Sequence, residues 1–433
     1  MKILHTADLH LGQVIYQNYD RADEHRQFFA QLEKWCKEEQ PDALLVSGDV
    51  FDIQQPSAAT KKAFTDSFVD LHRACPQMKI VITAGNHDSA SRIQADSAVW
   101  ELANAVLIGT APAMGISDGE WQDDYIVKLD SGYIIAMPYM NGNRCEQLQS
   151  ILDRVAQDNT ENKPVVMMGH LAVTGMDATG HEIGTIRTQE VASLGTGYDY
   201  CALGHIHKPQ TIGHPDDCME EDVTYPSGVV RYSGSALHVS CDEKYPHSVS
   251  VVNIEEHGGD VNIKQLRIDE LRHFYELPED KDACFKTADE ALRAIHEFAE
   301  ENKSGYFRLK IDYNADLPSN FSNMVYDTLI PYGDEVRFNP KHIWVGKPEV
   351  SMEECSKPVF EVAELQDMKD PYTFVEKTKD QYPGLDLDMV KEAFEEVKEE
   401  AKRLAEEKES KKSSKKKMAK ETEMESNEEI EEL

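Results

Sequence analysis

Five short polar clusters, each directly after a run of apolar and β-branched residues, constrain this sequence more than any other feature. The runs are of the length and composition of buried strands. Open α/β sheets place ligands just beyond the carboxyl ends of their strands, so the clusters are expected to converge at one sheet edge. The clusters are Asp8-Leu9-His10, Gly48-Asp49, Gly85-Asn86-His87, Gly169-His170 and Gly204-His205-Ile206-His207.

The runs between these clusters predict a layered α/β domain. A helical repeat of apolar residues covers 23–39, and a second stripe after Pro56 carries Phe64, Phe68 and Leu71. We interpret this second stripe as core, with a homodimer contact as the alternative. The predicted strands cover 2–5, 43–47, 79–83, 134–137, 165–168 and 200–203.

Changes in composition divide the chain into four parts. Two strand-like runs around the turn at 257–260 close the first, α/β part. The second part is expected to be a small α+β unit, with a strand near 306–313 between helices near 288–302 and 319–329. The third is a linker with amphipathic helices, and the fourth is a disordered charged tail. The predicted bounds are 1–270, 271–348, 349–409 and 410–433.

Apolar residues recur at helical spacing from Leu387 to Leu404, between Glu and Lys residues. Such a helix is expected either to bind a partner or to pack on its own domain.

Length and cysteine usage indicate a cytoplasmic protein. The chain has 433 residues and 40% apolar content, enough for two or three folded units. It contains no apolar run of the roughly 18 residues needed to span a membrane, and the N-terminus turns polar at Lys2, too early for a secretory signal. Eight cysteines are scattered singly, without C-x-x-C pairs. We therefore expect reduced thiols and no membrane attachment.

The net charge of −35 restricts how the chain could hold a nucleic acid. Proteins that bind DNA unaided usually present a basic surface to the phosphates. Any binding of DNA by this chain must therefore rely on bound divalent metals, on local basic positions or on a partner with a positive groove.

The residue types in the five clusters suit divalent cations. Carboxylate, imidazole and amide ligands together are typical of manganese, iron or zinc, and a carboxylate such as Asp49 could bridge two ions. Each histidine taken alone has a structural role as its alternative, but five clusters at equivalent strand ends are difficult to explain by chance.

The clusters also match a known pattern. The motifs D-x-H, G-D-x-x-D, G-N-H-D, G-H and G-H-x-H resemble the signature of the calcineurin-like metallophosphoesterases. Within that superfamily, the strings at 3–12, 48–52 and 202–207 resemble the SbcD group of bacterial nucleases, relatives of the Mre-type nucleases. This resemblance implies a four-layer β-sandwich flanked by helices, followed by a small DNA-capping domain at 271–348.

The resemblance implies a role for each matching residue. One metal would be held by Asp8, His10 and His207, the other by Asn86, His170 and His205, with Asp49 bridging, and manganese is the expected ion. The remaining implied roles are the catalytic acid for His87, orientation of a ligand for Asp52, and DNA contacts for Arg92, Arg187 and Lys208.

Some polar residues have weaker assignments. The string Arg231-Tyr232-Ser233-Gly234-Ser235 resembles a segment near the DNA path, although ordinary strand-to-turn chemistry explains it equally well. For Arg92, Arg187 and Lys208, a solvated surface role is the alternative. No role is assigned to His5, His25 or His181.

The implied function is that of a metal-dependent DNA nuclease component of a larger complex. It would be a double-strand 3′–5′ exonuclease and a single-strand or hairpin endonuclease, working as a homodimer with an SbcC-type ABC ATPase that has a long coiled coil, in DNA end processing, repair and recombination. A small-molecule phosphodiesterase or phosphomonoesterase is the main alternative, since ligands fix reaction type and not substrate size. A scaffold that has lost activity is disfavoured because every expected ligand position is filled.

Overall fold

The computed structural model describes most of residues 1–346 and little beyond them. The chain divides into two compact units, 1–346 and 347–433. The amphipathic helix predicted at 387–404, the charged tail, His181 and Arg187 lie outside the described residues. Those described are 1–346 except 17–18, 114–115, 117–120, 141–144, 180–187, 215–221, 281 and 302–303, together with residue 391.

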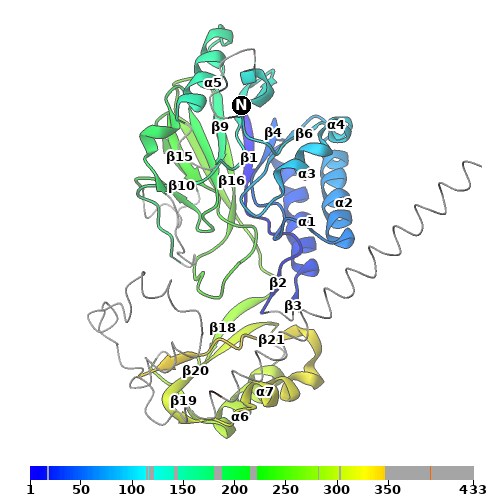
Figure 1. Ribbon diagram of the computed structural model, residues 1–433, viewed down its shortest axis with the longest axis vertical. Coiled ribbons are helices and arrows are strands. Elements are labelled where there is room, and N and C mark those ends of the chain that lie inside the picture. Colours follow the sequence, from blue (N-terminus) through cyan, green and yellow to red (C-terminus); the bar gives the residue numbers. More distant parts are fainter. Residues whose placement is uncertain are drawn as a thin grey trace, which may run out of the picture. The chain divides into compact units, whose positions relative to one another are not determined.

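Two large sheets make up the body of the first 270 described residues (Figure 1). The first sheet has the order β14 (Asp222–Tyr225), β17 (Val261–Arg267), β16 (Ser248–Ile254), β1 (Lys2–Thr6), β4 (Ala43–Ser47), β5 (Lys79–Thr83) and β6 (Ala105–Ile108). The second has the order β13 (Gln210–Thr211), β15 (Val229–Tyr232), β12 (Tyr200–Gly204), β9 (Val165–His170), β8 (Gly132–Ala136) and β7 (Ile126–Leu129). Two small ribbons pair β2 (Val14–Ile15) with β3 (Tyr19–Asp20) and β10 (Ala172–Val173) with β11 (Thr188–Gln189).

The strands of the first sheet are apolar on both faces because both faces are covered. In β4, Leu45 packs toward the second sheet, whereas Leu44 and Val46 pack toward the helices on the other side. This explains why the strand runs are continuous rather than alternating. Figure 1 shows α1 and α2 against the first sheet, and α5 packs on the second, so the layers run helix, sheet, sheet, helix.

The helices of this region follow the predicted apolar stripes. Phe28 and Leu32 of α1 and Phe64 and Phe68 of α2 are buried together in one cluster, which confirms that the second stripe is core. No helix of the described residues is long and apolar enough to cross a membrane. The α-helices are α1 (Ala22–Glu39), α2 (Ala58–Ala74), α3 (Ala90–Ala95), α4 (Ser97–Trp100) and α5 (Cys145–Asp158), and the 3-10 helices are η1 (Glu101–Ala103), η2 (Trp121–Tyr125) and η3 (Val191–Leu194).

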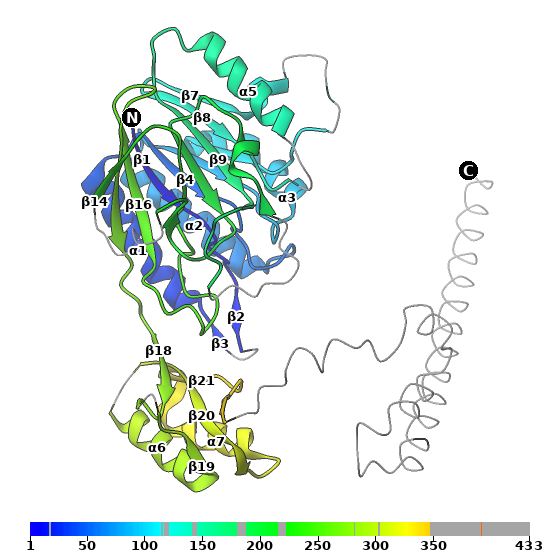
Figure 2. The same cartoon turned by 90° about the vertical axis from the view of Figure 1, so that its left-hand side faces the viewer.

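A second region has its own sheet and its own apolar core. Its helices cover one sheet around the long strand β20, with Ile295, Phe307 and Phe338 buried inside (Figure 2). We call residues 273–345 the second domain; the exact boundaries of the four predicted parts stay predictions. Its elements are β18 (His273–Leu277), β19 (Phe285–Thr287), α6 (Ala288–Glu300), β20 (Gly305–Asp316), α7 (Phe321–Leu329), η5 (Ile330–Glu335), β21 (Val336–Phe338) and β22 (Ile343–Val345).

A buried polar network joins the second domain to the start of α1. The Glu24 carboxylate, 3% exposed, accepts hydrogen bonds from Arg21 at 2.6 Å, from the Tyr306 hydroxyl at 2.5 Å and from Arg337 at 3.2 Å. Arg272 lies 3.5 Å from the same carboxylate. A buried carboxylate with this many charged partners fixes the geometry in which the two regions meet.

Candidate metal centre

All five polar clusters lie at one edge of the stacked sheets. β1, β4 and β5 are parallel neighbours in the first sheet, and β9 and β12 are parallel neighbours in the second. The two sheets meet at this edge, where the ring Nδ1–H of His170 donates to the Ser47 carbonyl at 2.8 Å. The convergence expected from the sequence is confirmed.

The backbone turns sharply at the ends of these strands. Asp8, His10, Asp49 and His205 all have positive φ angles, of 51°, 45°, 49° and 92°. A residue with a Cβ rarely adopts this region, at a cost of about 1–3 kcal/mol each, and such residues cluster at functional sites. The strain re-aims these side chains from the strand direction into one small volume.

Two glycines allow the loops to approach this closely. A Cβ on Gly48 would lie 2.2 Å from His170 Nδ1, and one on Gly204 would lie 1.9 Å from the Ser47 carbonyl oxygen. Any side chain at either position would force the two sheets apart, so both motifs require glycine.

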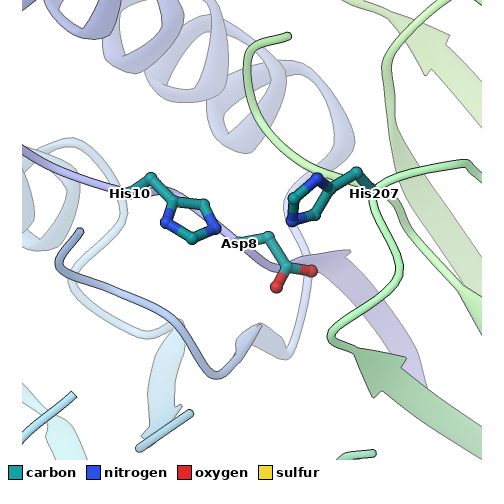
Figure 3. Close-up of side chains that lie close together, drawn as sticks. All are labelled: Asp8, His10 and His207. Carbon is teal, nitrogen blue, oxygen red and sulfur yellow. The ribbon is translucent and has the colours of Figure 1, made fainter. Parts of the chain in front are cut away.

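Asp8, His10 and His207 form a first group of possible metal ligands. One ligand atom from each lies within 4.8 Å of the others, and all three side chains are buried. Figure 3 shows the His10 and His207 rings flanking the Asp8 carboxylate. The Asp8 carboxylate also accepts a hydrogen bond from the His205 backbone amide at 3.0 Å, which connects it to the fifth cluster.

Asp49, His170 and His205 form a second group within the same limit. The Asn86 side-chain oxygen lies 3.0 Å from His170 Nε2 and 2.9 Å from His205 Nδ1, so it belongs to this group as well. Asp49 Oδ2 is 3.3 Å from His170 Nε2 and 4.0 Å from His10 Nε2. Asp49 therefore lies between the two groups, as a bridging carboxylate must.

The donor atoms suit divalent cations in number, type and burial. Both ring nitrogens of His10 are buried without a hydrogen-bond partner, and its Nδ1 makes only a 3.3 Å ion-pair contact with Asp52. A buried polar atom without a partner is unfavourable unless something else satisfies it. The mixed oxygen and nitrogen set is that of manganese, iron or zinc.

The electrostatics of the two carboxylates differ. Burial, together with the neighbouring Asp49 charge, raises the pKa of Asp8 to about 7. Burial also acts to raise the pKa of Asp49, but the adjacent His170 and His10 rings hold it well below its usual range. Burial lowers the pKa of His170, yet the Asp49 carboxylate outweighs it and brings that pKa to about 9. Protons thus bind where cations would otherwise compensate the buried negative charge.

His87 lies beside the groups, on the solvent side. Its side chain is exposed, its ring centroid is 4.9 Å from that of His10, and its Nδ1–H donates to the Asp52 carbonyl at 2.8 Å. His10, Asp52 and His87 also form a third group within ligand distance of one another. The role of His87 as acid rather than ligand stays a prediction, as do the metal roles of the other residues.

Two carboxylates that the motif reasoning missed support the site. Asp88 accepts hydrogen bonds from the backbone amides of Val50, Phe51 and Gly85 at 2.8–3.0 Å, so it ties the second loop to the third. Glu243 lies 3.0 Å from His207 Nδ1. Asp88 follows a motif residue and could have been noticed; Glu243 carries no sequence signal of its role.

The residues expected near DNA have different surroundings. Arg92 is exposed on α3, whereas the Lys208 ammonium is ion-paired with Asp177 and lies over the Tyr245 ring. Arg231 is fully buried and donates to Ser250 and Thr211, so proximity to a DNA path is wrong for Arg231 and the strand explanation is right.

The two unassigned histidines that the structure describes are also buried. His5 contacts the Tyr200 hydroxyl at 2.7 Å, and the His25 ring contacts the Leu9 carbonyl at 2.8 Å. Both therefore have structural surroundings.

Comparison with known proteins agrees with the fold and the ligand pattern. Residues 1–209 match the model of the calcineurin-like phosphoesterase family. The chain is similar to the SbcD component of the nuclease SbcCD from three bacteria: it is 30% identical over 285 residues to that of Rhodobacter capsulatus, 29% over 278 residues to that of Escherichia coli K12 and 28% over 279 residues to that of Bacillus subtilis. These matches cover 58–59% of this chain and 66% of each relative, slightly less than two thirds of their length.

Proposed function

Because residues 1–209 belong to the calcineurin-like phosphoesterase family, we propose that this protein is a metal-dependent nuclease that hydrolyses DNA phosphodiester bonds. The observation that carries the proposal is the pair of ligand groups around Asp49, with Asp8, His10 and His207 on one side and Asn86, His170 and His205 on the other. Two metal positions sharing one carboxylate are the arrangement that in-line phosphoryl displacement requires.

Each protein residue has a defined part in the proposed reaction. Bound as a pair, divalent ions would activate a water molecule and neutralise charge on the phosphoryl oxygens. Asp49 keeps the two ions adjacent, and Asp8 and Asn86 complete one group each. His87 donates its Nδ1–H to the Asp52 carbonyl, so Nε2 is the atom that can give a proton to the leaving sugar oxygen.

Manganese is the proposed ion. Carboxylate and amide oxygens together with imidazole nitrogens, and no thiolate in the ligand groups, suit manganese better than a closed structural zinc site. Activity restored to metal-stripped protein by Mn²⁺ at lower concentration than by Mg²⁺ or Zn²⁺ would support this choice.

DNA is proposed as the substrate because the relatives are nucleases and because a second domain follows the site. The test offers the full chain, with Mn²⁺, duplexes with 3′-recessed and blunt ends, a hairpin, and a nitrophenyl phosphodiester. We expect cleavage of the DNA substrates, with 3′–5′ shortening of the duplexes and opening of the hairpin.

The control is the Asp49→Asn variant, which removes the bridging charge and must abolish all turnover if the site is responsible. Turnover of the nitrophenyl ester alone would contradict the nuclease proposal and favour a small-molecule phosphodiesterase. The net charge of −35 is the observation that favours that second candidate.

The SbcCD name of the relatives suggests a partner ATPase. We propose that the helix predicted at 387–404 binds an SbcC-type ATPase, which would supply the positive DNA groove that this acidic chain lacks. The full chain should retain a purified SbcC-type ATPase on a column, whereas a chain ending at Lys369 should not. Equal retention by both would contradict this part of the proposal.

A homodimer is proposed through the outer face of α4 and η1. Val99 and Leu102 are 69% and 87% exposed there, and Arg92 on the adjacent α3 remains the proposed phosphate contact. Leu102→Glu should lower the mass measured by light scattering from two chains to one, whereas the neighbouring Glu101→Gln should not.

A further inference from the structure

The loop between β15 and β16 brings a buried carboxylate to the back of a metal-group histidine. Glu243 is 2% exposed. Its Oε1 lies 3.0 Å from His207 Nδ1, and its Oε2 accepts a hydrogen bond from the Val239 amide at 3.0 Å and lies 3.4 Å from His247 Nε2. Both carboxylate oxygens are therefore engaged, so the direction in which Glu243 faces His207 is fixed.

The other histidines of the site are held at Nδ1 in different ways. His10 Nδ1 is 3.3 Å from the Asp52 carboxylate, while His170 Nδ1–H donates to the neutral Ser47 carbonyl. The first ligand group thus has a carboxylate behind each histidine. A carboxylate behind an imidazole fixes its tautomer and orientation and makes the opposite nitrogen a stronger ligand. For His207 that opposite nitrogen is Nε2.

The same loop is held by the second domain. Arg308 of β20 donates to the Asp242 carboxylate at 2.7 Å and lies 3.3 Å from the Cys241 sulfur, and Asn339 donates to that sulfur at 3.2 Å. Arg21, part of the polar network around Glu24, donates to the His238 carbonyl. The residues on both sides of Glu243 are therefore fixed by groups outside the loop.

We propose that Glu243 is a positioning residue that aims His207 Nε2 at the first ligand group, and that Arg308 of the second domain maintains Glu243 in this position through the 238–247 loop. The proposal rests on the two-metal centre argued above. It assigns to the second domain a direct influence on one metal position and none on the other, whose histidine His170 depends on the sheet backbone.

The test measures Mn²⁺ affinity and stoichiometry of the full chain by calorimetry and by electron paramagnetic resonance. Glu243→Ala should weaken one of two Mn²⁺ sites by roughly 10–100-fold and leave the other unchanged. Glu243→Gln keeps an oxygen that can accept from His207 and should recover most of the affinity. Saturating Mn²⁺ should restore kcat to Glu243→Ala, because the residue does not touch the substrate.

Glu270→Gln is the matched control. Glu270 is a carboxylate partly buried beside the same loop, where it contacts His238 and His273 but no residue of the ligand groups. Both Mn²⁺ affinities should be those of the unaltered chain. A fall in both affinities in Glu243→Ala, without recovery in Glu243→Gln, would indicate a merely structural role and overturn the proposal.

A double-mutant cycle tests the link to the second domain. Arg308→Gln should weaken the same Mn²⁺ site several-fold in the unaltered chain and have no further effect in the Glu243→Ala background. Additive losses would overturn the link.

The outcomes separate from those of the proposed function. Binding of fewer than two Mn²⁺ ions by the unaltered chain would contradict the metal centre itself. Two ions bound without DNA cleavage would contradict only the nuclease, and the Glu243 test would still be decisive.

Discussion

The edge of the stacked sheets and the second domain bury very different side chains. At the sheet edge, Asp8, Asp49 and His170 are almost inaccessible to solvent, and several neighbouring residues adopt strained backbone angles. The core of the second domain is apolar, and among the described residues none of the possible metal groups includes one of its side chains. The difference indicates that the first region accepts unfavourable burial for the sake of chemistry, while the second is built for stability and placement.

The two regions also differ in what a single substitution should do. Loss of a side chain at the sheet edge should remove activity, whereas loss of one in the second domain should remove stability. Four variants can contradict or sharpen this contrast.

Asp49→Ala should have the largest effect. It removes the one carboxylate that both ligand groups share, so Mn²⁺ binding should fail and hydrolysis should fall by about 10⁴-fold, since several kcal/mol of charge stabilisation are lost at about 1.36 kcal/mol per tenfold. Metal titration and cleavage assays measure this. Residual paired binding of Mn²⁺ would exclude a bridging role.

His87→Ala should reduce cleavage by roughly 10²–10³-fold, as expected for a missing proton donor, with both Mn²⁺ ions retained. Calorimetric Mn²⁺ titration together with single-turnover cleavage separates the two effects. Loss of an ion would instead place His87 among the ligands, within the third group that it forms with His10 and Asp52.

Ile295→Ala tests the second domain. Ile295 of α6 is fully buried, so truncation should destabilise this domain by about 2–5 kcal/mol. Thermal unfolding followed by circular dichroism should show the loss, while Mn²⁺ binding at 25 °C should be unchanged. Glu297→Ala, exposed on the same helix, is the control and should change neither. Weaker Mn²⁺ binding in a still-folded Ile295→Ala protein would contradict the separation of the two regions.

Acid should destabilise the first region through buried histidines. Burial and the nearby Arg231 lower the pKa of His5 to about 3, against about 6.5 when unfolded. Below pH 6.5 the unfolded chain binds a proton that folded His5 does not, so its contribution is complete above pH 6.5 and is lost progressively toward pH 3.

At pH 5 the loss from His5 is about 2 kcal/mol, and burial lowers the pKa of His25 to about 4 with the same sign. His5→Phe should therefore reduce the slope of unfolding free energy against pH between 6.5 and 5, measured by urea denaturation. An unchanged slope would mean that His5 does not remain neutral in the folded protein.

The sequence predicted the local elements well. The strands at 43–47 and 79–83 and the helix that follows Pro56 were expected from periodicity and are present, because alternation and helical spacing are properties of short segments. The five clusters follow their strands as expected, since chain order and parallel pairing suffice to bring them to one edge.

The sequence was less informative about charged side chains. Lys208 was expected to contact DNA, yet its charge is already paired with Asp177, 31 residues earlier in the chain. Arg231 resembled a surface residue and is buried between strands. A charged side chain has many possible partners, and only the folded chain selects one.

The sequence by itself determined which residues form the candidate site, because each cluster is short and lies directly after a strand that its own residues specify. Only the tertiary structure decided how those residues are oriented. Glu243 reaches His207 from 36 residues away and Asp88 reaches Val50 from 38, and contacts at that separation arise when sheets stack and loops close, which no local pattern encodes.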